Sequence, residues 1–468
     1  MQAVLAAVSL VLGVNLIVPM TAHRARPIQA ETLFHTLFAD FFSEADGTVY
    51  VQTGDIPAMW LRDSSAQTLP YIRFGGAYPI LTLRFAKVIE REARNIKTDP
   101  YANAFSADYH VWERKWEADS LTWPVLLTWV YWQRTGFRGI FTSSLHQALR
   151  SIVDTWRCEQ LHAQCSRYVW RGVRDTQPFN TQTGMVWSAF RPSDDPVRYH
   201  FNIPMQAQIV VALQDLARLA IVGYADTNLA NEAASMAAQI ETGIETYGRV
   251  WNAAYGGWVY VYETDGLGNV TYMDDANLPD LTSLPYFGYC ASDNPAYLNT
   301  RNYALSKRNP WYFVGKYAEG LGSEHTPYGY VWPLGLMARA LTATSSAETS
   351  QEVTTLAETD SEQGLIHESF DPDAYWQYTR DEFGWANALY ASLIFRSVAG
   401  FSYMPFTASG DAVLPNEPYS KTPTLTPLSV QLADTAILFR ALGDLLERAD
   451  GRTTIAPIRS IIKRTAPH

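Results

Sequence analysis

The sequence predicts a mostly helical protein, built as a toroid of helical hairpins with short β-hairpins in its loops. Three observations support this prediction. Apolar residues recur at helical intervals along most of the chain, aromatic and polar loops separate these segments, and no low-complexity linker divides the 468 residues. Consecutive helices joined by short loops pack as antiparallel pairs, and a ring of pairs gathers its loops at the ends. A two-domain helical protein would give the same periodicity.

The helices follow from apolar spacing and from residues that start or stop a helix. Leu121, Val125, Thr128 and Trp132 are separated by 4, 3 and 4 positions, and Gly136 ends this segment. The same reasoning predicts helices near 30–43, 78–93, 121–135, 145–156, 204–222, 228–247, 333–343, 350–358, 385–398 and 428–448. RVWNAAYGGWVYVYET, residues 249–264, is typical of a β-hairpin.

Composition narrows the class of function. Hydrophobic residues make up 47% of the chain, which is enough for a large core. A net charge of −11 argues against nucleic acid as a partner, because phosphate binding needs clustered Lys and Arg. The 15 Trp and 27 Tyr provide flat apolar faces with polar edges, which suit either an aromatic core or sugar binding. Nothing in the chain demands a partner protein, so we expect a monomer.

Cysteine and metal-ligand patterns are weak. Cys158 and Cys165 are close enough to pair locally, which would leave Cys290 free, but reduced thiols are an equal alternative. The chain has no zinc, calcium, phosphate-loop or serine-hydrolase motif. We therefore expect neither a metal nor a cofactor.

The N-terminus has an apolar run from Ala3 to Met20 without a preceding basic segment. Residues 1–26 are interpreted as a signal peptide or as an N-terminal segment that matches related proteins poorly. Residues 27–468 are interpreted as a single catalytic domain. If residues 1–22 are a signal peptide the protein is secreted, and otherwise it is cytoplasmic. No other stretch is expected to insert into a membrane.

The stretch GDIPAMWLRDSSAQTLPYI, residues 54–72, crowds polar side chains around one indole. We interpret it as a loop entering a helix, with Asp63 or Ser64 as the N-cap. Pure scaffolding would not require so many donors and acceptors there. The stretch therefore predicts a concave site for a ligand rich in hydroxyl groups, lined by Asp55, Trp60, Arg62 and Asp63.

Five further segments have the same mixture of aromatic, acidic and basic residues. They are HVWERKWEADS (110–120), FRPSDDP (190–196), YMDDANLPDLTSLPY (272–286), GLGSEHTPYGYVWP (320–333) and GLIHESFDPDAYWQYTRDEFGWANALY (364–390). Their candidate binding residues are Trp112, Glu113, Arg191, Asp274, Asn277, His325, His367, Trp385 and Asn387.

Without a metal, a cofactor or a nucleophilic Ser or Cys, paired carboxylates are the remaining source of chemistry. Glycoside hydrolysis needs one carboxylic acid and one carboxylate on opposite sides of a sugar. Asp194 and Asp195 are adjacent, and like charges raise the pKa of an acid. Glu368 lies on a distant loop and is the candidate partner.

Together these segments resemble glycoside hydrolase family 125, the exo-α-1,6-mannosidases. The motifs that carry the resemblance are GDIPAMWLRDSSAQ (54–67), VWERKWEADS (111–120), FRPSDD (190–195), MDDANLP (273–279), SLPYFGY (283–289), NTR (299–301) to NPW (309–311), YVWP (330–333), HESF (367–370) and WAN (385–387). They follow the order of the family and span about 50–395.

The resemblance implies an (α/α)6 toroid that removes terminal non-reducing α-1,6-linked mannose from a glycan, by inversion and without a metal. It also implies that Asp194 or Asp195 is the general acid and that Glu368 is the base. This chain departs from the family at 322–327, where Glu324 stands in place of Pro, and at 379–387. A glycosidase of different sugar or linkage specificity, or a carbohydrate-binding protein without activity, would share these features.

Overall fold

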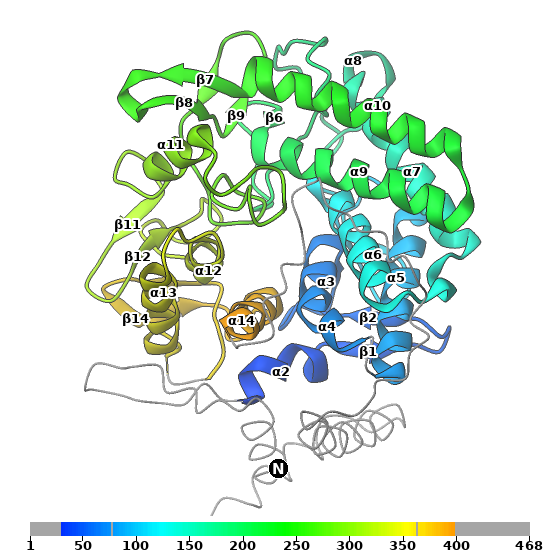
Figure 1. The fold of residues 1–468 in the computed structure, drawn as a ribbon, viewed down its shortest axis with the longest axis horizontal. Coiled ribbons are helices and arrows are strands. Elements are labelled where there is room, and N and C mark those ends of the chain that lie inside the picture. The colour runs from blue at the N-terminus through cyan, green and yellow to red at the C-terminus, as the bar shows by residue number, and fades with distance from the viewer. Residues whose placement is uncertain (1–29, 76–77, 362–363, 398–468) are drawn as a thin grey trace, which may run out of the picture.

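The structure is a computed structural model that describes residues 30–75, 78–361 and 364–397. Its helices form a ring around a central core (Figure 1). The outer helices are α2 (Ala30–Ala39), α5 (Pro79–Thr98), α7 (Ser143–Gln160), α10 (Thr227–Gly243), α11 (Pro295–Ala304) and α13 (Ser346–Glu358). The inner helices are α3 (Leu61–Thr68), α6 (Thr122–Thr135), α9 (Ile203–Tyr224), α12 (Pro333–Leu341) and α14 (Gly384–Ser397). Two short helices, α4 (Ile72–Gly75) and α8 (His162–Cys165), extend α3 and α7.

Inner and outer helices alternate along the chain, and α3, α6 and α9 pack side by side, as do α12, α14 and α3. Between α9 and α12, the inner position is taken by a run of turns over 281–290 instead of a helix. This run is buried, and Thr282 O accepts a hydrogen bond from Tyr297 Oη of α11 at 2.8 Å. The described chain thus forms six outer and five inner helices, with one irregular inner segment.

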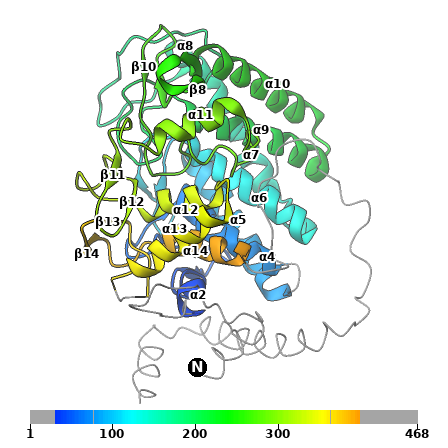
Figure 2. The same ribbon diagram turned by 60° about the vertical axis from the view of Figure 1, so that its left-hand side comes forward.

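All paired strands are antiparallel and short. The sheets are β1 (Phe41–Ser43) with β2 (Val49–Val51), β3 (Met59–Trp60) with β4 (Ala104–Phe105) and β5 (Val111–Glu113), β6 (Phe201–Asn202) with β9 (Glu263–Thr264) and β10 (Val270–Thr271), β7 (Arg249–Asn252) with β8 (Gly257–Tyr260), β11 (Tyr312–Val314) with β12 (Glu319–Leu321), and β13 (Ser369–Asp371) with β14 (Ala374–Thr379). The strands labelled in Figure 2 gather at one end of the helices.

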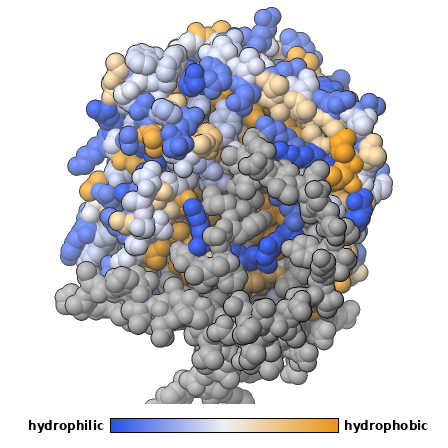
Figure 3. Space-filling view, in the orientation of Figure 1, coloured by the Kyte–Doolittle hydropathy of each residue, from blue (hydrophilic) through white to orange (hydrophobic). Residues whose placement is uncertain are grey.

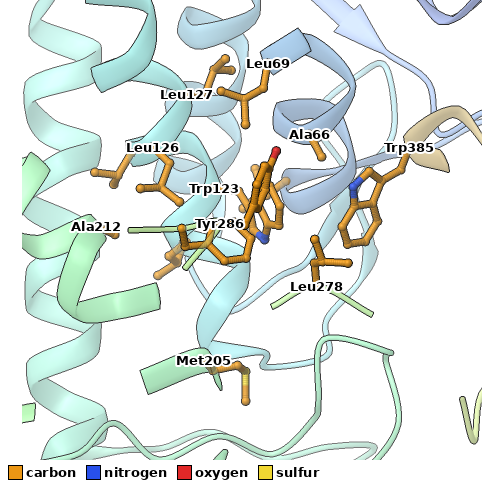
Figure 4. Packing of buried hydrophobic residues seen from close by; sticks show 14 of the residues in the cluster. Ala66, Leu69, Trp123, Leu126, Leu127, Met205, Ala212, Leu278, Tyr286 and Trp385 are labelled. Carbon is orange, nitrogen blue, oxygen red and sulfur yellow. The ribbon is translucent and has the colours of Figure 1, made fainter. Parts of the chain in front are cut away.

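Aromatic rings join the inner helices beneath this end. Trp123 of α6 meets the edge of Trp385 of α14 with ring centroids 5.5 Å apart, and meets Phe287 at 5.3 Å. Leu278 and Tyr286 pack around the same rings (Figure 4). Edge-to-face contacts are a preferred arrangement of aromatic pairs. The loops at this end therefore lie on a core of packed aromatic rings.

The sequence predictions of helices near 30–43, 78–93, 121–135, 145–156, 204–222, 228–247, 333–343, 350–358 and 385–398 are confirmed, with shifted ends. The hairpin within 249–264 is confirmed as β7 and β8, and Cys158 is disulfide-bonded to Cys165. The predicted helix at 428–448 and the signal-peptide interpretation of 1–26 lie outside the described residues. Helix α11 was not predicted.

Two expectations are wrong. Asp63 and Ser64 do not cap α3, because the helix starts earlier, at Leu61, and Trp60 is its N-cap residue. Helix α9 is long and apolar enough to cross a membrane, although the sequence analysis expected no such segment after the N-terminus. However, 72% of its apolar window is buried within the protein, as in the core helix of a globular fold.

The serines of the 54–72 stretch hold α3 to α5. Ser64 Oγ and Ser65 Oγ both donate to Glu92 Oε1, at 2.9 and 2.7 Å, and the second carboxyl oxygen of Glu92 is buried without a partner. Burial raises the pKa of Glu92 to about 8. These serines hold the two helices together and were not among the residues of this stretch predicted to line the ligand site.

Glu92 makes the stability of the fold depend on pH. Its folded pKa lies above its unfolded value, so its contribution is fully present below about pH 4.5 and is lost as the pH rises toward 8. We expect Glu92→Gln to remove this loss, at most about 1.4 kcal/mol per pH unit. The free energy of unfolding in urea, measured from pH 5 to 8, should fall less steeply for the variant. Parallel curves for the two proteins would contradict this assignment.

Candidate active site

Arg62 is the centre of a buried charge cluster at the start of α3. Its side chain is only 4% exposed, and four carboxyl groups surround it. Nη1 donates to Glu117 Oε2 at 2.9 Å and to Asp119 Oδ2 at 3.2 Å, and Nη2 donates to Asp194 Oδ1 at 2.6 Å. Asp63 Oδ2 lies 3.8 Å from Nε. Three distant segments therefore meet at one guanidinium.

The cluster has more acids than bases. Besides Arg62, the nearest cation is Lys115, whose Nζ lies 3.9 Å from Asp194 Oδ2. Burial raises the pKa of Asp63 to about 6 and raises that of Glu117 well above its ordinary value. The neighbouring Asp194 carboxylate adds to the raised pKa of Glu117, so Glu117 is the group of this pair that holds a proton. This part of the site retains a proton that isolated carboxylates would lose.

The pKa of Asp194 differs from the expectation. Burial alone would raise it, but the Arg62 guanidinium, the neighbouring Glu117 carboxyl and the Lys115 ammonium hold it well below its usual range. Adjacent like charges were expected to raise the pKa of the acid, and for Asp194 this is wrong. The cations outweigh the like charges because Arg62 touches the carboxylate directly.

The FRPSDD loop is a tight turn that presents two carboxyl groups in different directions. Arg191 N donates to Asp195 O at 2.7 Å, and Asp194 N donates to Arg191 O at 3.0 Å. Asp194 has φ +66°, a left-handed conformation that costs energy for a residue with a side chain. Ser193 Oγ donates to Asp195 Oδ2 at 2.8 Å. In this turn the side chain of Asp194 points to Arg62, and that of Asp195 points toward His325.

The 322–327 loop contacts the FRPSDD loop at two points. Arg191 Nη1 donates to Glu324 Oε2 at 2.6 Å, while Arg191 Nε donates to the buried Glu263 at 2.7 Å. His325 Nδ1 lies 3.7 Å from Asp195 Oδ2. Although burial alone would lower it, neighbouring carboxylates, Asp195 foremost, raise the pKa of His325 to about 9. His325 therefore carries a positive charge at neutral pH.

Glu368 lies on another segment of the chain, immediately before β13. Its backbone N donates to Thr379 O at 3.3 Å, which aligns it with β14. Arg380 Nη1 lies 3.6 Å from Glu368 Oε1, and Arg380 Nε donates to Asp55 Oδ1 at 2.8 Å. Arg380 thereby joins the carboxylate of Glu368 to the GDIPAMW loop.

The charges of Asp194, Asp195 and Glu368 all contribute to the raised pKa of His325. Similarly, the charge of Asp194 raises the pKa of Asp63 and the charge of Arg380 lowers it. The FRPSDD acids and Glu368 therefore influence the same groups of the site, although they come from segments far apart in the sequence.

Three predicted aromatic residues occupy different surroundings. Trp385 lies under Arg62, with the guanidinium carbon 5.8 Å from its ring. Trp60 is buried beside Ala58 and Ala104, and its Nε1 has no hydrogen-bond partner within the described chain. Trp112, by contrast, is 51% exposed on β5. The carboxylate of its neighbour Glu113 accepts a hydrogen bond from Asn103 Nδ2 and forms an ion pair with Lys115.

Four predicted binding residues are buried and form hydrogen bonds within the fold. Asn387 is fully buried, and its amide bonds the backbone of Ile366 and Phe383. His367 Nδ1 donates a hydrogen bond to Arg380 O at 3.0 Å, and its ring stacks on Tyr378 with centroids 3.6 Å apart.

Asp274 and Asn277 lie behind the site in the same way. Asp274 has no exposed surface and accepts from Leu281 N at 2.9 Å. Asn277 Nδ2 bonds Asp275 and Ser323. Because their polar atoms are turned into the fold, these residues hold loops in place and have little surface to offer a sugar.

Sequence reasoning missed Glu117, Asp119 and Glu263 as site residues, and it gave Lys115 and Arg380 no role although both lie in the polar segments. Glu117 and Asp119 lie within VWERKWEADS, where the density of acids was the available signal. Glu263 has no local signal, because only the fold brings it to Arg191.

Across residues 30–397, apart from 76–77 and 362–363, no group of three or more His, Cys, Asp or Glu is arranged to hold a metal ion. The site offers paired carboxyl groups, flanking cations and buried indoles. Such an arrangement can transfer protons to and from a bound hydroxyl-rich ligand.

Comparison with known proteins agrees with this site. A sequence profile of the metal-independent alpha-mannosidases (GH125) matches residues 26–395. The meiotically up-regulated gene 157 protein of Schizosaccharomyces pombe is 34% identical over 387 residues, which cover 74% of this chain and 75% of that protein.

A metal-independent α-mannosidase of Streptococcus pneumoniae, solved with α-1,6-mannobiose in a non-productive complex, is 36% identical. The match has a TM-score of 0.75 and covers 79% of this chain and 92% of that one. The glucoamylase of Hormoconis resinae shares the fold at 14% identity and a TM-score of 0.52, over 76% of this chain and 69% of that one. The helical ring is thus the (α/α)6 toroid of six-hairpin glycosidases, and the chain belongs to glycoside hydrolase family 125, the metal-independent α-mannosidases.

Proposed function

We propose that this protein is an exo-acting, inverting α-mannosidase that releases terminal α-1,6-linked mannose from a glycan. The observation that carries the proposal is that acids from distant loops each lie beside a cation of the site. Asp194 lies 2.6 Å from Arg62. Asp195 lies 3.7 Å from His325, and Glu368 lies 3.6 Å from Arg380. Inverting glycosidases need two carboxyl groups roughly 6.5–9.5 Å apart, so that water fits between one of them and the sugar. The α-1,6-mannobiose bound by the pneumococcal relative supports the linkage.

Asp194 is the proposed general acid. Its place beside Glu117 supports this role, because Glu117 retains a proton that it can pass to Asp194 as Asp194 protonates the departing oxygen. As negative charge develops on that oxygen, Arg62 keeps Asp194 oriented through the 2.6 Å contact. Asp195, held by Ser193 and close to His325, is then free to accept a hydrogen bond from a sugar hydroxyl.

Glu368 is the proposed general base. It takes a proton from the water that attacks the anomeric carbon on the face opposite to the leaving group. Arg380 supports this role by keeping a positive charge 3.6 Å from the carboxylate while it is bound to Asp55. Asp63 and Arg62 are the proposed partners of the terminal sugar hydroxyls, above Trp385.

Glu368→Gln should reduce hydrolysis of α-1,6-mannobiose by about 10²–10⁴-fold, because Gln cannot accept a proton. Affinity for the disaccharide, measured by calorimetry, should be retained since the side chains have the same shape. Glu358→Gln, an exposed change on the outer helix α13, is the matched control and should keep full activity. Undiminished turnover in Glu368→Gln would refute the role of this residue.

Asp194→Asn and Asp195→Asn separate the two acids. Fluoride leaves without protonation, so a variant lacking only the acid should still hydrolyse α-mannosyl fluoride while failing on α-1,6-mannobiose. We expect this split, by about 10²-fold or more, for Asp194→Asn and a similar loss on both substrates for Asp195→Asn. The reverse pattern would assign the acid to Asp195.

A further inference from the structure

The leaving-group side of the site can be located from the acid. The group that protonates the departing oxygen lies beside the leaving group, so loops that contact the FRPSDD turn from the solvent side border it. The 322–327 loop does this twice, through Glu324 at Arg191 and through His325 at Asp195. The inference that follows rests on the proposed function.

The Arg191 guanidinium contacts the buried Glu263 on one side and the exposed Glu324 on the other, at the edge of the leaving-group side (the rim). Glu263 is fully buried and binds Nε and Nη2, at 2.7 and 3.4 Å. Glu263 is itself fixed by the backbone N–H groups of Arg198 and Tyr199. The Arg191 side chain is 5% exposed, and the remaining donor, Nη1, is covered by Glu324, whose side chain is 53% exposed.

Glu324 therefore decides the charge that the leaving group meets. Glu263 and Asp195 already face the cations Arg191 and His325, and Glu324 adds one further negative charge. Without it, this side is less negative by one charge and Arg191 Nη1 loses its acceptor. A fixed cation with a free N–H group attracts carboxylate and phosphate, and a carboxylate that covers it repels them.

We propose that Glu324 is a specificity-determining residue that makes the leaving-group side reject anionic groups, so that this enzyme acts on mannosides whose leaving group is neutral. Removing its negative charge turns the Arg191–His325 rim from one that disfavours carboxylate or phosphate into one that accepts it. Glu324 is exposed, and the carbonyl oxygen of Gln can still accept from Arg191 Nη1, so we expect the fold to tolerate Glu324→Gln.

A matched pair of non-hydrolysable ligands tests this directly. 4-Carboxyphenyl and 4-carbamoylphenyl 1-thio-α-mannosides have nearly the same shape and differ by one negative charge. Calorimetry should show that the unaltered protein binds the carbamoyl compound about tenfold more tightly. In Glu324→Gln the preference should vanish or reverse, and added salt should weaken it in the unaltered protein. Glu358→Gln makes the same charge change on α13 and should keep the original preference.

The preference must be lost in Glu324→Gln alone. The proposal is overturned if Glu324→Gln keeps the preference of the unaltered protein, if that protein shows no preference, or if neither compound binds. Hydrolysis of α-1,6-mannobiose by the unaltered protein is measured in parallel. Its failure would overturn the proposed reaction, while the ligand comparison would still report on the charge of the rim.

Discussion

The site depends on one buried guanidinium. Arg62 lies among Asp63, Glu117, Asp119 and Asp194, which come from α3, the segment before α6 and the FRPSDD turn. Burying so many carboxyl groups is unfavourable unless a cation compensates them, and removing the cation would leave uncompensated charge. Arg62 therefore both joins three hairpins and sets which carboxyl group holds a proton. The position of the proposed acid and its proton supply have the same physical origin.

The other half of the site depends on how the ring closes. Helix α2 packs against α14, so the first and last described hairpins are neighbours, and Arg380 crosses between them to Asp55 and Thr53 O. His35 and Glu382 add a second link at 2.6 Å. Glu368 directly precedes the β13–β14 pairing, and its backbone N–H donates to Thr379 O, next to Arg380. Closure of the toroid and placement of the proposed base are consequently linked.

Much of this was accessible from sequence, for identifiable reasons. Helical periodicity predicted α5, α6, α7, α9 and α10, because their buried faces repeat without interruption. Motifs dense in polar and aromatic residues predicted Arg62, Asp194 and Glu368 as site members. Helix α11 and the turns at 281–290 have no such repeat. Asn387 and His367 looked functional because a polar residue beside a site residue has the same local signature whether it faces the ligand or the backbone behind it.

The stereochemistry of the released sugar tests the two-carboxylate account most directly. Proton NMR of the protein with α-1,6-mannobiose would follow the anomeric signals from the first minutes, before mutarotation mixes them. The account predicts β-mannose first, because water activated by Glu368 attacks the face opposite to the leaving group. Initial release of α-mannose would mean retention and would contradict the roles assigned to Asp194 and Glu368.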